Sequence, residues 1–113
     1  MCAAVATVPA SPASGFPTGT YSAKGLAATA TFEGNGKLHI SKGGVTEVEG
    51  DYTVKGDQIK LTDKSGPWAC TKAGEQTGTY RWEYANGTLA FRKMTDRCEG
   101  RAASLTKYTW KNQ

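Results

Sequence analysis

Aromatic side chains recur at alternate positions in the second half of the chain. Tyr80, Trp82 and Tyr84 alternate with polar residues, and alternate residues of a strand share one face. Such a face supplies apolar area, and a hydroxyl or indole N–H that can orient a polar ligand atom. The same stripe is also typical of a packed core, and the sequence leaves both interpretations open. The candidate ligand-binding residues are Tyr52, Tyr80, Trp82, Tyr84, Phe91, Tyr108 and Trp110.

Three cysteines stand at positions 2, 70 and 98. Cys70 and Cys98 each lie at the end of a strand-like run, and a disulfide between them would close a loop of 29 residues, counting both ends. Such a closure stabilises a folded chain by about 3–4 kcal/mol. The pairing predicts an oxidising, extracytoplasmic compartment; two reduced thiols are the alternative. A metal site is not expected, because the chain has a single His and no Cys-x-x-Cys motif.

Several titratable residues are weaker candidates for chemistry. His39 is the lone histidine and is predicted to lie opposite the apolar face of its strand. Glu47, Glu49 and Asp51 stand at every second position, where they could act as acid and base, although a solvated outer face is the favoured interpretation. Asp63 is expected in a turn. The chain has no glycine-rich phosphate loop and no nucleophile elbow, and nothing in it indicates a cofactor.

Two pairs of residues that include arginine are further candidates. Arg81 and Arg92 are predicted on adjacent strands of one hairpin, where they could hold a carboxylate ligand; pairing with Glu83 or with water is the favoured alternative. Asp96 and Arg101 lie close together in the chain, in a predicted loop around the last cysteine. They are expected to form a structural ion pair.

These residues are positioned by short alternating runs separated by turn residues. Asn86-Gly87 is the strongest hairpin signal in the chain, and Gly50, inside a strand, permits the sharp bend that barrel closure needs. The predicted strands cover residues 19–22, 26–32, 37–41, 46–54, 58–62, 78–84, 88–94 and 103–110.

About eight hairpin-linked strands predict an all-β fold, an antiparallel up-and-down β-barrel. An immunoglobulin-type sandwich also has a Trp between two Cys, but Trp82 stands too close to Cys98 for that fold. A barrel of eight strands either fills with side chains or holds one small ligand. Leu38, Ile40 and Val48 are candidate neighbours of the aromatic face in this interior.

Length, composition and charge exclude several other classes of protein. The chain has 113 residues and a mass of 12.0 kDa, enough for one domain. It has three Trp, five Tyr and three Phe, too many for a disordered chain, and no apolar run long enough to span a membrane. The net charge is +4, but basic and acidic residues alternate along the chain. A nucleic-acid partner is therefore not expected.

Residues 1–17 contain three of the four prolines and are predicted to form a flexible tether, followed by the barrel domain at 18–113. Cys2 followed by Ala-Ala is similar to the mature start of a bacterial lipoprotein, in which the cysteine is lipidated and anchors the protein to the membrane. An ordinary start followed by a disordered tail is the alternative.

Several segments resemble small, lipocalin-like (calycin-type) bacterial domains that are often extracytoplasmic lipoproteins. Gly19-Thr20-Tyr21 is similar to the Gly-x-Trp start of lipocalins, with Tyr in place of Trp. Residues 48–59 (VEGDYTVKGDQI) look like the middle hairpin of these domains, and residues 70–101 carry a similar later block. The resemblance implies an up-and-down barrel and an Arg, here Arg101, packed over the first-strand aromatic. Because the chain is shorter than a typical lipocalin, any cavity is expected to be small.

Three functions are compatible with this sequence. The first is an extracytoplasmic module that binds a small apolar or amphipathic ligand in its barrel. The second is an enzyme of the isomerase or cyclase type in the same barrel, with Tyr52, Tyr80, His39 or Arg92 converging inside. The third is a structural or interaction domain with a filled core.

Overall fold

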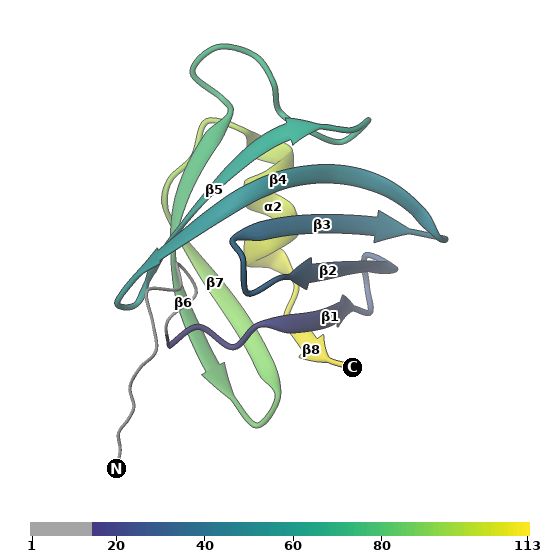
Figure 1. The fold of residues 1–113 in the computed structure, drawn as a ribbon, viewed down its shortest axis with the longest axis vertical. Helices are drawn as coiled ribbons and strands as arrows, with labels where there is room; N and C mark the ends of the chain where they lie inside the picture. The colour runs from purple at the N-terminus through teal and green to yellow at the C-terminus, as the bar shows by residue number, and fades with distance from the viewer. Residues whose placement is uncertain (1–14) are drawn as a thin grey trace.

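The computed structural model describes residues 15–113, and these form a closed barrel of eight strands with one helix (Figure 1). Cys2, with its predicted lipidation, and most of the predicted tether lie outside the described residues. The elements are β1 (Gly19–Ala23), β2 (Ala28–Phe32), β3 (Lys37–Lys42), β4 (Val45–Lys55), β5 (Gln58–Ser65), β6 (Thr77–Ala85), β7 (Thr88–Thr95), α2 (Glu99–Lys107) and β8 (Trp110–Asn112).

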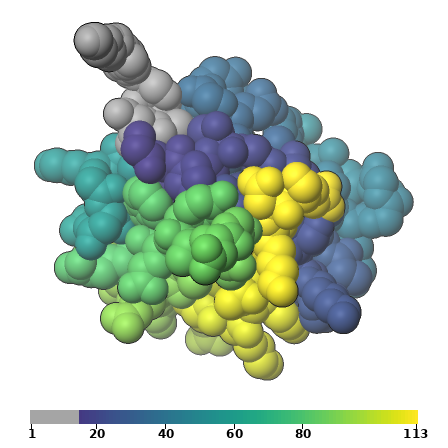
Figure 2. All heavy atoms as spheres, turned by 90° about the horizontal axis from the view of Figure 1, so that it is seen from below, coloured from purple at the N-terminus to yellow at the C-terminus, as the bar shows by residue number. Residues whose placement is uncertain are grey.

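Every strand pairs antiparallel with its neighbours in the chain, and β8 closes the barrel against β1. Tyr21 lies opposite Asn112 across this seam, and Leu89 of β7 lies opposite Trp110 on the other side of β8. Figure 2 shows the seam from below, with the yellow C-terminal segment between β1 in purple and the green β6–β7 hairpin. The predicted all-β, up-and-down barrel is therefore confirmed.

Glycines set the turns and one sharp bend. Asn86 and Gly87 both have positive φ, 52° and 76°, as a two-residue type I′ hairpin requires. At Gly50 the register between β4 and β5 shifts, and a Cβ there would lie 2.2 Å from the Thr62 carbonyl oxygen. The strand can approach its neighbour this closely only with glycine, so the bend predicted at Gly50 is present.

The helix α2 corrects the prediction for the last strand. Residues 103–110 were expected to be extended, but Glu99–Lys107 is helical and β8 begins only at Trp110. Ala102, Ala103 and Leu105 favour a helix, and Lys107 in the last turn complements the helix dipole. Only Leu105 is fully buried, so the segment lacks the repeated apolar spacing by which a helix is recognised in a sequence.

The end of the barrel opposite α2 is filled by aromatic rings. Phe16, which falls within the predicted tether, is buried between Phe32, Tyr52 and Trp82, with ring centroids 5.0, 5.7 and 5.1 Å away. The contacts with Phe32 and Trp82 are edge-to-face, an arrangement that is favourable beyond the area it buries. No described helix is long and apolar enough to cross a membrane.

Candidate functional site: a cavity under the helix

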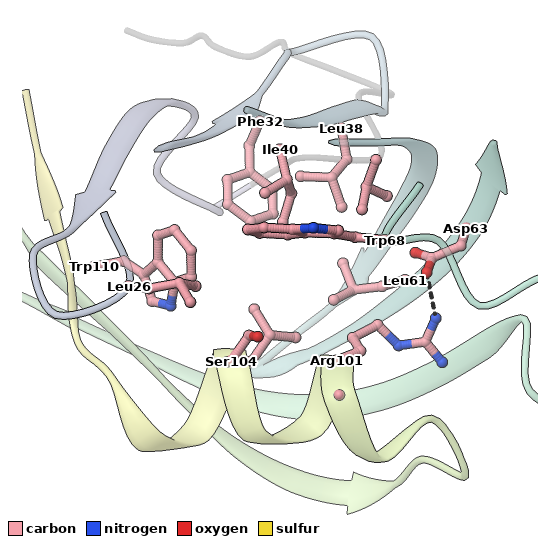
Figure 3. Close-up of a pocket in the computed structure, with 13 residues that line it drawn as sticks. Leu26, Phe32, Leu38, Ile40, Leu61, Asp63, Trp68, Arg101, Ser104 and Trp110 are labelled. Carbon is pink, nitrogen blue, oxygen red and sulfur yellow. Dashed lines mark ion pairs between the residues drawn. The ribbon is translucent and has the colours of Figure 1, made fainter. Parts of the chain in front are cut away.

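A partly enclosed cavity of about 330 Å³ lies inside the barrel at the end that α2 covers (Figure 3). Its size is near the lower limit of ligand pockets, about 300–1,000 Å³. The inward-facing side chains of four adjacent strands make its apolar wall. They are Phe32 of β2, Leu38 and Ile40 of β3, Val48 of β4 and Leu61 of β5. Three of these residues, Leu38, Ile40 and Val48, were predicted from the sequence to face the interior.

One face of α2 forms another wall of the cavity. Gly100 and Ser104 stand four residues apart, so they lie on the same side of the helix, and both line the cavity together with Arg101 and Leu105. The hydroxyl group of Ser104 points toward the cavity in Figure 3. Among the described residues it has no hydrogen-bond partner. This wall therefore presents one hydroxyl group without a partner, beside the paired side chain of Arg101.

Trp68 covers the cavity from the loop between β5 and β6. Its backbone N–H donates to the Glu47 carbonyl oxygen at 2.9 Å, and its side chain is 39% exposed. Lys42 lies over the ring, with Nζ 5.6 Å from the ring centroid, a cation–π distance. Gly66, with φ 117°, approaches the same Glu47 oxygen so closely that a Cβ would be 2.2 Å from it. The loop is thereby held against β4 with its Trp over the cavity.

A buried ion cluster closes the side of the cavity beyond Leu61. Arg101 donates to both carboxylate oxygens of Asp96, at 2.7 and 2.6 Å, and lies 3.1 Å from Asp63 Oδ2. Its remaining N–H groups donate to the carbonyl oxygens of Gln76 and Glu75, at 3.1 and 2.9 Å. The guanidinium thus makes four hydrogen bonds and an ion pair with Asp63, and the Arg101 side chain is only 8% exposed. The expected ion pair of Asp96 and Arg101 is present. The prediction that Asp63 lies in a turn is wrong, because Asp63 is buried within β5.

Asp96 and its two side-chain partners, Tyr80 and Arg101, have shifted pKa values. Burial would raise the pKa of Asp96, but hydrogen bonds from Arg101, from Tyr80 and from the Cys98 backbone N–H outweigh burial and lower it. Burial and the hydrogen bond to Asp96 raise the pKa of the Tyr80 hydroxyl far above its usual value. Burial by itself would lower the pKa of Arg101, yet the two carboxylates raise it. Asp96 and Arg101 are therefore charged at neutral pH, and Tyr80 is a neutral donor.

A disulfide links the covering loop to the helix. Cys70 and Cys98 are bonded, which bears out the predicted pairing, and Cys98 is the residue immediately before α2. The Cys70 backbone N–H also donates to Asp63 Oδ2 at 2.8 Å. The loop that carries Trp68 and the wall that carries Ser104 are thus joined covalently next to the ion cluster.

Trp110 lies at the opposite side of the cavity from the ion cluster, next to Leu26 (Figure 3). The residue is wholly buried. Its indole Nε1 is the one buried side-chain nitrogen or oxygen atom without a hydrogen-bond partner within residues 15–113. Buried N–H groups are nearly always paired, and this unpaired one is enclosed by neighbouring atoms, since neither the residue nor its Nε1 is exposed.

The candidate ligand-binding residues from the sequence are spread over the barrel, and of the seven only Trp110 lines the cavity. Tyr52, Tyr80 and Phe91 are buried in the core. Tyr84 is 43% exposed. Trp82 and Tyr108 are partly buried against the core. Trp82 lies next to Phe16, and Tyr108 lies beside Gly25, outside the cavity.

The buried tyrosines use their hydroxyl groups within the protein. Tyr52 donates to the Glu33 carbonyl oxygen, and burial, with the charge of Glu33 second, raises the pKa of Tyr52 to about 12. Tyr21 of the first strand donates to the Pro17 carbonyl oxygen, whereas Arg101 binds Asp96 and Asp63. Arg101 is thus engaged elsewhere than over the first-strand aromatic, which corrects the role that the resemblance implied.

The other titratable candidates lie on the outside of the barrel. His39 Nε2 is 2.5 Å from Glu33 Oε2, and both side chains are more than a third exposed. Arg81 lies opposite Arg92 across the β6–β7 hairpin, as predicted, but pairs with Asp57 at 2.8 Å. Tyr52, Tyr80, His39 and Arg92 therefore do not converge inside the barrel. The described residues hold no group of three or more His, Cys, Asp or Glu side chains placed to bind a metal.

Asp51, in the acidic stripe of β4, lies between two lysines on the outer surface. Its carboxylate is 3.2 Å from Lys37 Nζ and 3.5 Å from Lys64 Nζ. The hydrogen bond from Lys37, ahead of the smaller effect of Lys64, lowers the pKa of Asp51. Glu49 of the same stripe is exposed and Glu47 is half-buried. This arrangement matches the solvated outer face that was favoured for the stripe.

Trp68, Ser104 and Asp63 are among the cavity residues that were not identified from the sequence. Trp68 stands in an irregular segment, and only its pairing with β4 brings it over the barrel. Ser104 was placed in a strand. One signal for the contact between Asp63 and Arg101 was available in the sequence. Asp63 stands close to Cys70 and Arg101 close to Cys98, so a disulfide between the two cysteines brings these segments together.

The fold and the cavity together define a small, closed, eight-stranded up-and-down β-barrel with a cavity at one end. This architecture is compatible with a lipocalin-like fold. No known protein-family model, curated protein or solved structure matches the chain.

Proposed function

We propose that this protein is a lipocalin-like module that binds a small, mainly apolar ligand in the cavity under α2. The observation that carries the proposal is the cavity itself, about 330 Å³ of space inside an otherwise packed barrel. Interiors of folded proteins are packed densely, with few voids larger than a water molecule. A space of this size inside so small a domain costs stability, and ligand burial would offset that cost.

The lining fits an apolar ligand. Aliphatic and aromatic side chains form most of the wall, and the polar groups are few. Binding sites for small molecules have this composition, in which apolar area contributes affinity and a small number of polar atoms fix orientation. The disulfide supports an extracytoplasmic location, since structural disulfides persist in oxidising compartments.

The proposal is tested by titrating the purified, oxidised protein with N-phenyl-1-naphthylamine, a neutral probe whose emission rises in apolar surroundings. We expect saturable binding of one probe per chain and competition by 1-octanol. Absence of saturable binding by both compounds would reject the proposal.

A matched pair of variants locates the site. Ser104→Phe places a ring in the cavity and should reduce probe affinity at least tenfold. Ala103→Phe adds the same ring at the neighbouring position of α2, which is exposed, and should leave the affinity within twofold of the wild type. Equal effects of the two substitutions would show that the probe binds elsewhere. Circular dichroism and thermal unfolding of both variants check that the barrel remains folded.

A further inference from the structure

We propose that the mouth of the cavity is a docking surface for anionic lipid bilayers, formed by Lys42, Val45 and Trp68. These three residues make up the rim patch. Val45 and Trp68 enter the bilayer interface, and Lys42 lies beside the lipid phosphates. The docking itself is independent of the proposed function. Its consequence, the passage of an apolar ligand between the bilayer and the cavity, rests on the proposed function.

The rim patch brings exposed apolar side chains from two segments to one cation. Lys42 and Val45 stand opposite each other across the β3–β4 hairpin, so their side chains share one face. Lys42 Nζ lies 5.6 Å from the centroid of the Trp68 ring, and the Trp68 backbone N–H ties its loop to Glu47 of β4. Val45 is 57% exposed and Trp68 is 39% exposed. Both apolar side chains are therefore open to an occupant.

The apolar wall of the cavity continues to this patch. Trp68 lines the cavity and also reaches the surface. Ile40 and Val48 are paired across β3 and β4 and line the cavity. The pair of Lys42 and Val45 lies further along the same two strands, toward the hairpin. An apolar molecule that leaves the cavity past Trp68 therefore reaches the rim patch directly.

The charges around the cavity mouth favour an anionic surface. Lys42 is exposed and forms no ion pair with a described residue. The covering loop also carries the exposed Lys72, and Arg97 lies beside this loop, with Nη1 3.5 Å from the Cβ position of Gly74. The loop has one acidic residue, Glu75, which is half-buried. Cations near anionic headgroups strengthen membrane binding, and tryptophan favours the boundary between headgroups and acyl chains.

The small size of the rim patch favours a bilayer over a protein partner. A stable protein interface buries about 800 Å² on each partner, far more than two exposed side chains supply. Binding to a bilayer combines the insertion of apolar side chains with electrostatic attraction, and a few residues suffice for weak, reversible contact. We therefore expect binding that depends on anionic lipid and weakens in salt.

The test is sedimentation of the purified, oxidised full chain with lipid vesicles. One preparation contains phosphatidylglycerol and phosphatidylcholine in equal parts, and the other contains phosphatidylcholine alone. We expect binding to the mixed vesicles to be at least tenfold tighter, and to be largely lost in about 1 M NaCl, where exposed charges are screened. Absence of binding to the mixed vesicles in low salt would overturn the proposal.

Matched variants locate the contact. Val45→Ser and Trp68→Ser should each weaken binding to the mixed vesicles at least threefold, and Lys42→Glu about tenfold. The controls lie at the opposite end of the barrel, where Tyr84 is 43% exposed and Lys55 ends β4. Tyr84→Ser and Lys55→Glu should stay within twofold of the wild type. Equal losses in the controls would overturn the proposal, since net charge alone would then explain the binding.

Two further measurements separate the alternatives. Val45 does not line the cavity, so Val45→Ser decides the matter if Trp68→Ser fails to fold. Sedimentation velocity of the free protein tests a second copy as the occupant, and a dimer that Val45→Ser dissociates would overturn the proposal. Vesicle binding without binding of N-phenyl-1-naphthylamine would support the docking surface and reject the proposed function. Probe binding without vesicle binding would overturn the docking surface and leave the proposed function standing.

Discussion

Arg101 of α2 and Asp63 of β5 form an ion pair of 3.1 Å that joins the helix to the barrel wall at the edge of the cavity. Both side chains are more than nine-tenths buried. Since Asp96, five residues before it in the chain, binds the same guanidinium, the arginine joins β5 to the segment that leads into α2. The pair thereby fixes the position of α2, and with it the shape of the cavity.

Arg101→Met should lower the free energy of unfolding by about 3–5 kcal/mol, because two buried carboxylates would lose their common partner. Urea unfolding at pH 7 measures the loss. Arg97→Met is the control, since Arg97 is exposed, and it should change stability by no more than about 0.5 kcal/mol. A loss below about 1 kcal/mol in Arg101→Met would contradict a structural role for the cluster.

Much of the barrel could be predicted from the sequence because its signals are local. Tyr80 and its alternate neighbours indicate a strand, and Asn86-Gly87 indicates the hairpin that follows. The helix α2 could not be predicted in the same way, since a single fully buried residue, Leu105, gives no periodicity. The role of Asp63 also escaped, because its partner Arg101 reaches it only through the tertiary fold.

The position of the cavity depends on contacts that no local pattern contains. Phe16 fills the end of the barrel where Tyr52 and Trp82 lie, so those candidate ligand-binding residues pack against the N-terminal segment. The opposite end stays open because α2 presents Gly100 and Ser104 there. Which end is filled follows from where the two terminal segments fold.

Removal of the disulfide should destabilise the protein. The double variant Cys70→Ser/Cys98→Ser is expected to lose about 3–4 kcal/mol of unfolding free energy, the entropic value for a loop of this length. Urea unfolding with and without reductant measures it. The wild type should become less stable in reductant, whereas the double variant should not respond; a wild type insensitive to reductant while its thiols titrate as free would contradict the prediction.

Stability should fall at alkaline pH because of buried tyrosines. An unfolded Tyr ionises near pH 10, whereas the pKa of Tyr52 in the folded protein is about 12. Between these values the unfolded chain has released its proton and the folded chain has not, so rising pH favours unfolding. The contribution is complete below about pH 10 and is lost as the pH passes 12.

Tyr52→Phe tests this pH dependence. The variant should be about 1 kcal/mol less stable at pH 7, since it lacks the hydrogen bond to Glu33, but it should lose less stability than the wild type between pH 9 and pH 12. Urea unfolding across that range measures both effects. Parallel curves for the two proteins would show that Tyr52 is not responsible, and would leave Tyr80 and Tyr21, whose pKa values are also raised, as the sources.

Two glycine-to-alanine substitutions should act in opposite directions. A Cβ on Gly78 would lie 2.4 Å from Asp96 Oδ2, and that carboxylate cannot shift without breaking its bonds to Arg101 and Tyr80. Gly78→Ala should therefore cost about 1–3 kcal/mol. Gly100 has open space around its Cβ position and lies within α2, so Gly100→Ala should stabilise by up to about 1 kcal/mol. Urea unfolding midpoints at constant m-value measure both changes, and a destabilised Gly100→Ala would mean that the helix does not form in solution.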